Sequence, residues 1–322
     1  GDKGDKGDKG DAGVGIVSIV KTATNGNVDT YTITFTDGTT TTFEITNAYA
    51  ETQEVTEGLD FYPLADGTYG AKANRYLAYI AIPATYKGKP VTQILPGAFQ
   101  QSYIQAITIP DTVTSIGENA FKDCTSLTPI TIPDSVTSIG ASAFEGCTGL
   151  TELTLGASLR TINAEAFKDC TGLQTITIPR YVATIGAGAF DGCTALTAIE
   201  VAEGNLAYKS VDGNLYSADG TQLIRYAAGK TAESFVVPEG FTTICAGAFK
   251  DCMALKSVTI SEGVTTVEAG AFEGWTAEQH IAVSFATAEE TPEGWADGWA
   301  ADATVDYTVS EEAAGEETPA NE

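Results

Sequence analysis

The 322-residue sequence has almost no histidine, and this shortage leaves little room for catalysis that depends on an imidazole. His280 is the only histidine, so a triad that needs an imidazole base could form only there. The sequence contains no phosphate-binding loop, no Gly-x-Ser-x-Gly turn and no His-Glu-x-x-His pair. Carboxylates are numerous, but no spacing singles out an acid and base pair. We therefore expect no enzymatic activity.

Basic side chains and long apolar runs are also scarce. The chain has 17 Lys and Arg against 43 Asp and Glu, and its net charge of −26 repels phosphate backbones and anionic membrane surfaces. No apolar run reaches the length of a membrane-spanning helix. We therefore expect no nucleic-acid partner and no direct membrane insertion. The chain begins at Gly1 without a signal-peptide pattern, so we interpret it as a mature or excised part of a protein.

A pattern with a 23-residue period dominates the sequence. Phe121, Phe144, Phe167 and Phe190 are each separated by 23 residues. A fixed period of this length indicates a solenoid, in which each unit buries its apolar face against its neighbours. Within one unit the apolar positions are Leu127, Ile130, Ile132, Val136, Ile139, Ala143, Phe144 and Cys147.

The first three of these positions make the spacing Leu-x-x-Ile-x-Ile, which is typical of the strand of a leucine-rich repeat. Alternation along a strand turns Ile130 and Ile132 inward and leaves Thr131 outward. Pro133 then ends the strand because it has no N–H to donate. The sequence predicts a mainly β repeat solenoid, made of coils of about 23 residues with short parallel strands.

Four of the six cysteines occupy one position of this repeat. They are Cys124, Cys147, Cys170 and Cys193. Their side chains would run parallel rather than toward one another, and no two cysteines form a Cys-x-x-Cys pair. We expect a ladder of buried thiols rather than disulfides, and no metal or other cofactor.

Three segments precede the solenoid. Residues 1–13 carry glycine at every third position, as a collagen triple helix requires. We expect this segment to belong to a stalk that forms a homotrimer; the alternative is a flexible charged leader. Residues 14–47 alternate apolar and threonine positions and predict a small β-hairpin module with a preceding strand at Ile16 to Val20. Residues 48–56 are polar and predict a linker.

The solenoid with its caps is expected over residues 57–309. Phe61, Tyr62, Tyr69 and Tyr76 fit no repeat position and predict an N-terminal cap. The C-terminal cap is expected at Trp295 and Trp299. An insert at about 202–234 interrupts the repeat and predicts a β-hairpin between Val211 and Tyr226, whereas 310–322 should be an acidic disordered tail.

Two surfaces are candidates for ligand binding. The first is a threonine-rich face on the strands; the alternative is that threonine simply suits an exposed strand. The second is the hairpin, where we expect exposed tyrosines. The face residues are Thr108, Thr131, Thr154 and Thr177 in one column and Thr128, Thr151, Gln174 and Thr197 in another, and the hairpin residues are Tyr208, Tyr216 and Tyr226.

The pattern Ile-Thr-Ile-Pro, Val-Thr-Ser-Ile-Gly, Ala-Phe and Cys resembles the BspA-type leucine-rich repeats of bacterial surface proteins. The resemblance extends over about residues 57–309. It implies an extracellular or cell-surface protein, often an adhesin, that binds an extracellular protein or glycan. A different reading of the same chain is a structural spacer or surface-layer scaffold that presents another module.

Overall fold

A computed structural model describes residues 16–25, 28–46, 58–74, 77–284 and 288–307. The chain forms two compact units, residues 1–55 and residues 56–322. The predicted collagen-like segment 1–13, the linker 48–56 and the acidic tail 310–322 lie outside the described residues.

The first unit contains a three-stranded antiparallel sheet. Its second and third strands meet at a turn where Gly38 has a φ of +82°. The Thr39 N–H and hydroxyl both donate to the Asp37 carboxylate, at 2.9 and 2.6 Å, which lowers the pKa of that carboxyl. The sequence predicts a hairpin with a preceding strand at Ile16 to Val20; in the structure the first strand continues to Asn25. The strands are β1 (Ile16–Asn25), β2 (Val28–Phe35) and β3 (Thr40–Thr46), in the order β1-β2-β3.

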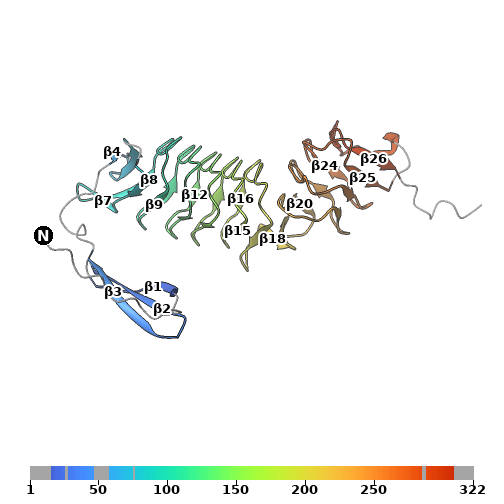
Figure 1. The fold of residues 1–322 in the computed structure, drawn as a ribbon. Helices are drawn as coiled ribbons and strands as arrows, with labels where there is room; N and C mark the ends of the chain where they lie inside the picture. The colour runs from blue at the N-terminus through green and yellow to red at the C-terminus, as the bar shows by residue number, and fades with distance from the viewer. Residues whose placement is uncertain (1–15, 26–27, 47–57, 75–76, 285–287, 308–322) are drawn as a thin grey trace, which may run out of the picture. The chain divides into compact units, whose positions relative to one another are not determined.

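The second unit is a solenoid whose successive coils lie side by side (Figure 1). Each regular coil contributes one strand to each of two walls. In the first, which we call the return wall, equivalent residues of successive coils pair in parallel, for example Ile116 with Ile139. Its continuous strands are β8 (Lys89–Ile94), β10 (Ser115–Ile116), β12 (Ser138–Ile139), β14 (Thr161–Ile162) and β16 (Thr184–Ile185).

The second wall, which we call the front wall, carries the predicted Leu-x-x-Ile-x-Ile strands as short parallel sheets. The ladder is interrupted between β9 and β11, where Pro129 lacks an N–H, and again between β13 and β15. The strands are β6 (Tyr79–Ala81), β9 (Ala106–Thr108), β11 (Ile130–Thr131), β13 (Leu153–Thr154), β15 (Thr175–Ile178), β17 (Ala198–Val201), β21 (Ser234–Val236), β23 (Ser257–Thr259), β25 (His280–Val283) and β26 (Thr304–Tyr307).

The core between the walls is built around stacked phenylalanines. The ring of Phe144 lies 5.0 Å from that of Phe121 and 5.5 Å from that of Phe167, with nearly parallel planes. All three side chains are fully buried. Because each ring is covered by the rings of both neighbouring coils, no coil buries its apolar face alone.

The cysteine position completes each coil. All six cysteines are free, and only Cys245 is not fully buried. The ladder thiols donate hydrogen bonds to phenylalanine carbonyl oxygens of the preceding coil, as Cys147 does to Phe121 at 3.1 Å. Burial raises the pKa of the Cys147 thiol well above its ordinary value. The predicted ladder of buried thiols is confirmed. At the end of the ladder the Trp275 indole N–H replaces the thiol and bonds the Phe249 carbonyl oxygen at 2.9 Å.

Aromatic side chains cover both ends of the solenoid. Phe61 stacks on Tyr86 at 4.3 Å and Tyr69 meets the same ring edge-on, as the N-terminal prediction required. Tyr62 is instead exposed, because it lies on the outer face of its strand, and Tyr76 lies outside the described residues. The elements here are β4 (Leu59–Pro63), β5 (Tyr69–Ala73) and β7 (Thr85–Tyr86).

At the C-terminal end, Trp295 and Trp299 pack edge to face at 4.6 Å. Trp299 also covers Phe272 at 6.1 Å, so the predicted C-terminal cap is confirmed. The 3-10 helix η1 (Ala288–Glu290) precedes the two tryptophans.

The insert divides the solenoid into two cores. The first core cluster ends at Leu215 and the second begins at Tyr216. The predicted hairpin is confirmed, and a third strand that pairs with it rejoins the return wall. Among the described residues β16 has no strand partner beyond β14, so the return wall is open at this point. The strands are β18 (Tyr208–Val211), β19 (Asn214–Ser217), β20 (Gln222–Arg225), β22 (Thr243–Ile244) and β24 (Thr266–Val267).

Candidate binding surfaces

The threonine-rich face lies on the front wall, where none of its members contributes to the core. Thr131 pairs in register with Thr154, and Thr177 pairs with Glu200, which ends the column. The Thr128 and Thr151 hydroxyls lie 3.0 Å apart. All eight predicted residues of this face are exposed: Thr108, Thr131, Thr154, Thr177, Thr128, Thr151, Gln174 and Thr197.

The tyrosines of the insert do not form the expected exposed surface. Tyr216 and Tyr226 are each only 2% exposed, so both are removed from the candidate contact surface. Strands β19 and β20 cover the open end of the second core, and this position turns both rings inward against Phe241 and Phe249. Burial raises the pKa of Tyr226 to about 12. Tyr208 is half-buried, and its hydroxyl accepts a hydrogen bond from the Ile185 N–H at 2.9 Å.

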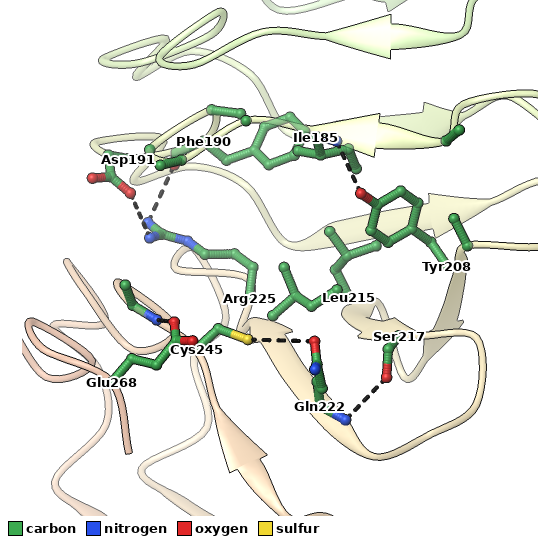
Figure 2. A pocket seen from close by; sticks show the side chains of 18 residues that line it. Ile185, Phe190, Asp191, Tyr208, Leu215, Ser217, Gln222, Arg225, Cys245 and Glu268 are labelled. Atoms are coloured by element: carbon green, nitrogen blue, oxygen red, sulfur yellow. Dashed lines mark hydrogen bonds and ion pairs between the residues drawn. The ribbon is translucent and has the colours of Figure 1, made fainter. Parts of the chain in front are cut away.

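A cleft of about 460 Å³ lies where the return wall is open (Figure 2). One side is formed by the coil that contains Ile185 and Phe190. The strands of the insert supply Leu215 and Ile224, and the two coils that follow supply Cys245 and Glu268. The lining is mixed, with apolar side chains beside a few polar groups, as is common for ligand sites. The sequence signals this cleft only by the spacing of Phe190 and Phe249, which are 59 residues apart, 36 more than one repeat.

Arg225 connects the two sides of the cleft. Its side chain is only 6% exposed, and one guanidinium nitrogen donates to Asp191 at 2.8 Å (Figure 2). The same nitrogen donates to the Gly247 carbonyl oxygen, and the second donates to those of Phe190 and Lys250. A buried guanidinium with these acceptors fixes the two coils relative to each other.

A small charged network surrounds this arginine. The Lys250 ammonium pairs with Asp191 at 3.2 Å and with Glu273 at 3.0 Å. The Asp251 carboxylate accepts the Gly192 N–H at 2.8 Å. Asp191 is therefore neutralised by two cations, whereas the Glu268 carboxylate accepts only the Ala246 N–H at 2.8 Å and remains exposed.

Cys245 lines the cleft, and His280 lies on the front wall. Burial and the nearby Glu268 carboxylate raise the pKa of Cys245 to about 11, so this thiol is protonated near neutral pH. His280 pairs with Asp306 at 2.9 Å between two front-wall strands, and both side chains are about half exposed. Within the described ranges, no group of three His, Cys, Asp or Glu side chains is arranged to hold a metal ion. No helix in the described part of the chain is long and apolar enough to cross a bilayer.

Three solved structures are similar to this chain. Among solved structures, a leucine-rich cell surface protein of Faecalibacterium prausnitzii is 25% identical over 79% of this chain and 94% of its own, with a TM-score of 0.40. The pneumococcal vaccine antigen PcpA is 18% identical over 90% of this chain and 99% of its own, with a TM-score of 0.51, which supports the fold. A leucine-rich repeat protein of Eubacterium ventriosum is 26% identical, covering 72% of this chain and 65% of its own, with a TM-score of 0.48.

No protein of curated function matches the sequence. The profile of the BspA-type leucine-rich repeat region matches in six copies, over residues 92–212 and 226–289. These ranges cover more than half of the chain and contain the phenylalanine and cysteine columns. The chain therefore belongs to the BspA-type leucine-rich repeat family of bacterial surface proteins.

Proposed function

We propose that this chain is an extracellular or cell-surface binding protein, adhesin-like, that holds a protein or glycan ligand against its front wall. The exposed threonine-rich face carries this proposal. It presents hydroxyl groups in register on successive coils, and none of them is needed for the core. Membership in a family of surface repeat proteins supports an extracellular location and a binding role rather than catalysis.

The chemistry of the face suits a hydrogen-bonding ligand. Each threonine hydroxyl both donates and accepts, so a row of them can match peptide groups or sugar hydroxyls. Successive parallel strands place these hydroxyls about 5 Å apart, which gives a flat and regular surface. The net charge of −26 disfavours strongly anionic ligands at low ionic strength.

The test is a binding screen followed by paired variants. The full chain is presented to purified extracellular-matrix proteins and to a glycan array. Any ligand found is then measured with the double variant Thr131→Lys and Thr154→Lys. We expect affinity to fall by roughly tenfold or more, because two lysines disrupt the hydrogen-bonding surface at its centre.

The matched control is Thr114→Lys with Thr137→Lys, two exposed threonines at the return wall. This control should bind as the parent chain does. A screen without ligands, or equal losses in the two double variants, would contradict the proposal and favour the spacer or surface-layer scaffold.

A further inference from the structure

Each regular coil offers a fixed set of backbone groups to the coil that follows. The coil that contains Phe167 shows the regular pattern. Its Arg160 and Ile162 carbonyl oxygens accept the N–H groups of Ala183 and Gly186, which belong to the next coil. Farther along the same coil, N–H groups donate forward to the next coil: Glu165 to Ala187 at 3.0 Å, Phe167 to Ala189 at 2.9 Å and Asp169 to Asp191 at 2.7 Å.

The coil that faces the cleft has no such neighbour, and side chains bind several of its groups instead. Tyr208 accepts the Ile185 N–H, Asp251 accepts the Gly192 N–H, and Arg225 donates to the Phe190 carbonyl oxygen. Four further backbone groups of this coil have no hydrogen-bond partner among the described residues. In the regular coils, the equivalent backbone groups form hydrogen bonds with the next coil. These groups, all on residues that line the cleft, are the carbonyls of Ala183 and Ile185 and the N–H groups of Gly188 and Phe190.

Arg225 adds one more unpaired donor to the same cleft. A guanidinium carries five N–H bonds. The two terminal nitrogens of Arg225 make four hydrogen bonds, whereas its Nε–H has no partner in the part of the chain that the structure describes. The side chain lines the cleft and is only 6% exposed.

We propose that the cleft binds an extended peptide segment of a partner protein, which adds a strand to the open edge of β16. This inference rests on the proposed binding function and names a second site for it. Peptide N–H groups would bond the Ala183 and Ile185 carbonyls, and peptide carbonyls would bond the Gly188 and Phe190 N–H groups.

The occupant is a peptide rather than a sugar because the open groups repeat the bonding pattern between coils. A main chain in the register of a further coil therefore matches donor to acceptor along the edge. Ile224, which lines the cleft and is partly exposed, provides apolar surface for inward-facing peptide side chains. The exposed carboxylate of Glu268, with the acidic field of the chain, favours a neutral or basic segment over an acidic one.

The probe is a capped peptide with the sequence Thr137 to Ala143, which occupies the same register on another coil of the solenoid. Amide hydrogen exchange is followed by NMR on the full chain. In the free protein, the amides of Gly188 and Phe190 should exchange much faster than the equivalent amides of Glu165 and Phe167. Peptide at up to about 1 mM should protect Gly188 and Phe190 selectively.

Two variants locate the effect. Ala187→Trp introduces a large side chain at an exposed residue that lines the cleft, and should weaken peptide binding by roughly tenfold or more. Ala164→Trp makes the same change at the equivalent exposed position one coil earlier, and should bind the peptide as the parent does. Slow exchange of Gly188 and Phe190 in the free chain, no protection by the peptide, or equal binding by both variants overturns the inference.

The front-wall variant separates this inference from the proposed function. Thr131→Lys with Thr154→Lys should leave peptide binding unchanged, because both residues lie outside the cleft lining. Loss of peptide binding in that variant would place the peptide on the front wall and overturn the cleft assignment. A front-wall screen without ligands, combined with specific protection in the cleft, would contradict the proposed front-wall function alone.

Discussion

Arg225 takes over a role that cysteine plays in the regular coils. The thiol of each ladder cysteine bonds a phenylalanine carbonyl of the preceding coil. After Phe190 the repeat is interrupted, and the Arg225 guanidinium reaches the Phe190 carbonyl oxygen instead, at 3.2 Å. The larger side chain also reaches Asp191, so one residue satisfies a buried backbone group and joins two cores.

Replacement of this arginine should therefore be costly. Arg225→Met removes the charge and leaves Asp191 and several carbonyl groups without their donor. We expect the free energy of unfolding to fall by about 3–5 kcal/mol, as for other buried ion pairs that lose one partner. Urea denaturation followed by circular dichroism measures the change.

Lys122→Met is the control for this experiment. Lys122 pairs with Glu145 at 2.8 Å, but its side chain is 28% exposed. Its loss should cost less than about 1 kcal/mol. If the two variants have the same stability, Arg225 does not join the two cores as described.

The direction of most side chains could be predicted from strand alternation. Ile130 and Ile132 are buried and Thr131 is exposed, as the alternation required. The prediction that Tyr216 is exposed was wrong, because which face of a hairpin is covered depends on what the hairpin packs against. The role of Arg225 could not be predicted either, because its partners Asp191 and Phe190 lie 34 and 35 residues away in the sequence.

At the scale of elements, the 23-residue period predicted the coil but only one of its two strands. Return-wall strands such as Ser138–Ile139 have two residues, which is too short for alternation to be visible in the sequence. They form a sheet because equivalent residues of successive coils pair in register. The cleft escaped prediction for the same reason, because it is the missing pairing between β16 and β20.

The C-terminal cap is an element whose removal should act locally. Trp299→Ala uncovers Phe272 and leaves a cavity beside Trp295. We expect a loss of about 3–5 kcal/mol, concentrated in the last coils. Hydrogen-exchange mass spectrometry should show faster exchange in β25, with no change in β12.

Tyr103→Ala provides the comparison, because Tyr103 is 74% exposed and should have little effect on stability. Uniformly faster exchange in every coil of the Trp299→Ala protein would argue against a local cap.

At the scale of the whole molecule, the acidic charge and the repeat architecture act together. Each coil contacts only its neighbours, so the solenoid can present a long surface without a central core. A net charge of −26 keeps such surfaces apart at low ionic strength. An attachment that brings several copies together would have to overcome this repulsion. The three Gly-Asp-Lys triplets at the N-terminal end of the sequence carry both signs of charge.

The last prediction concerns assembly through residues 1–13. If this segment forms a collagen-like trimer, three front walls act together and the affinity for a multivalent ligand rises without any new contact. Light scattering of the full chain should then give the mass of three 33.5-kDa chains, with the trimer favoured at low temperature and low salt. A chain that starts at Val14 should be monomeric. Equal masses for the two proteins would show that the segment does not direct assembly, and any avidity would then have to come from elsewhere in the protein.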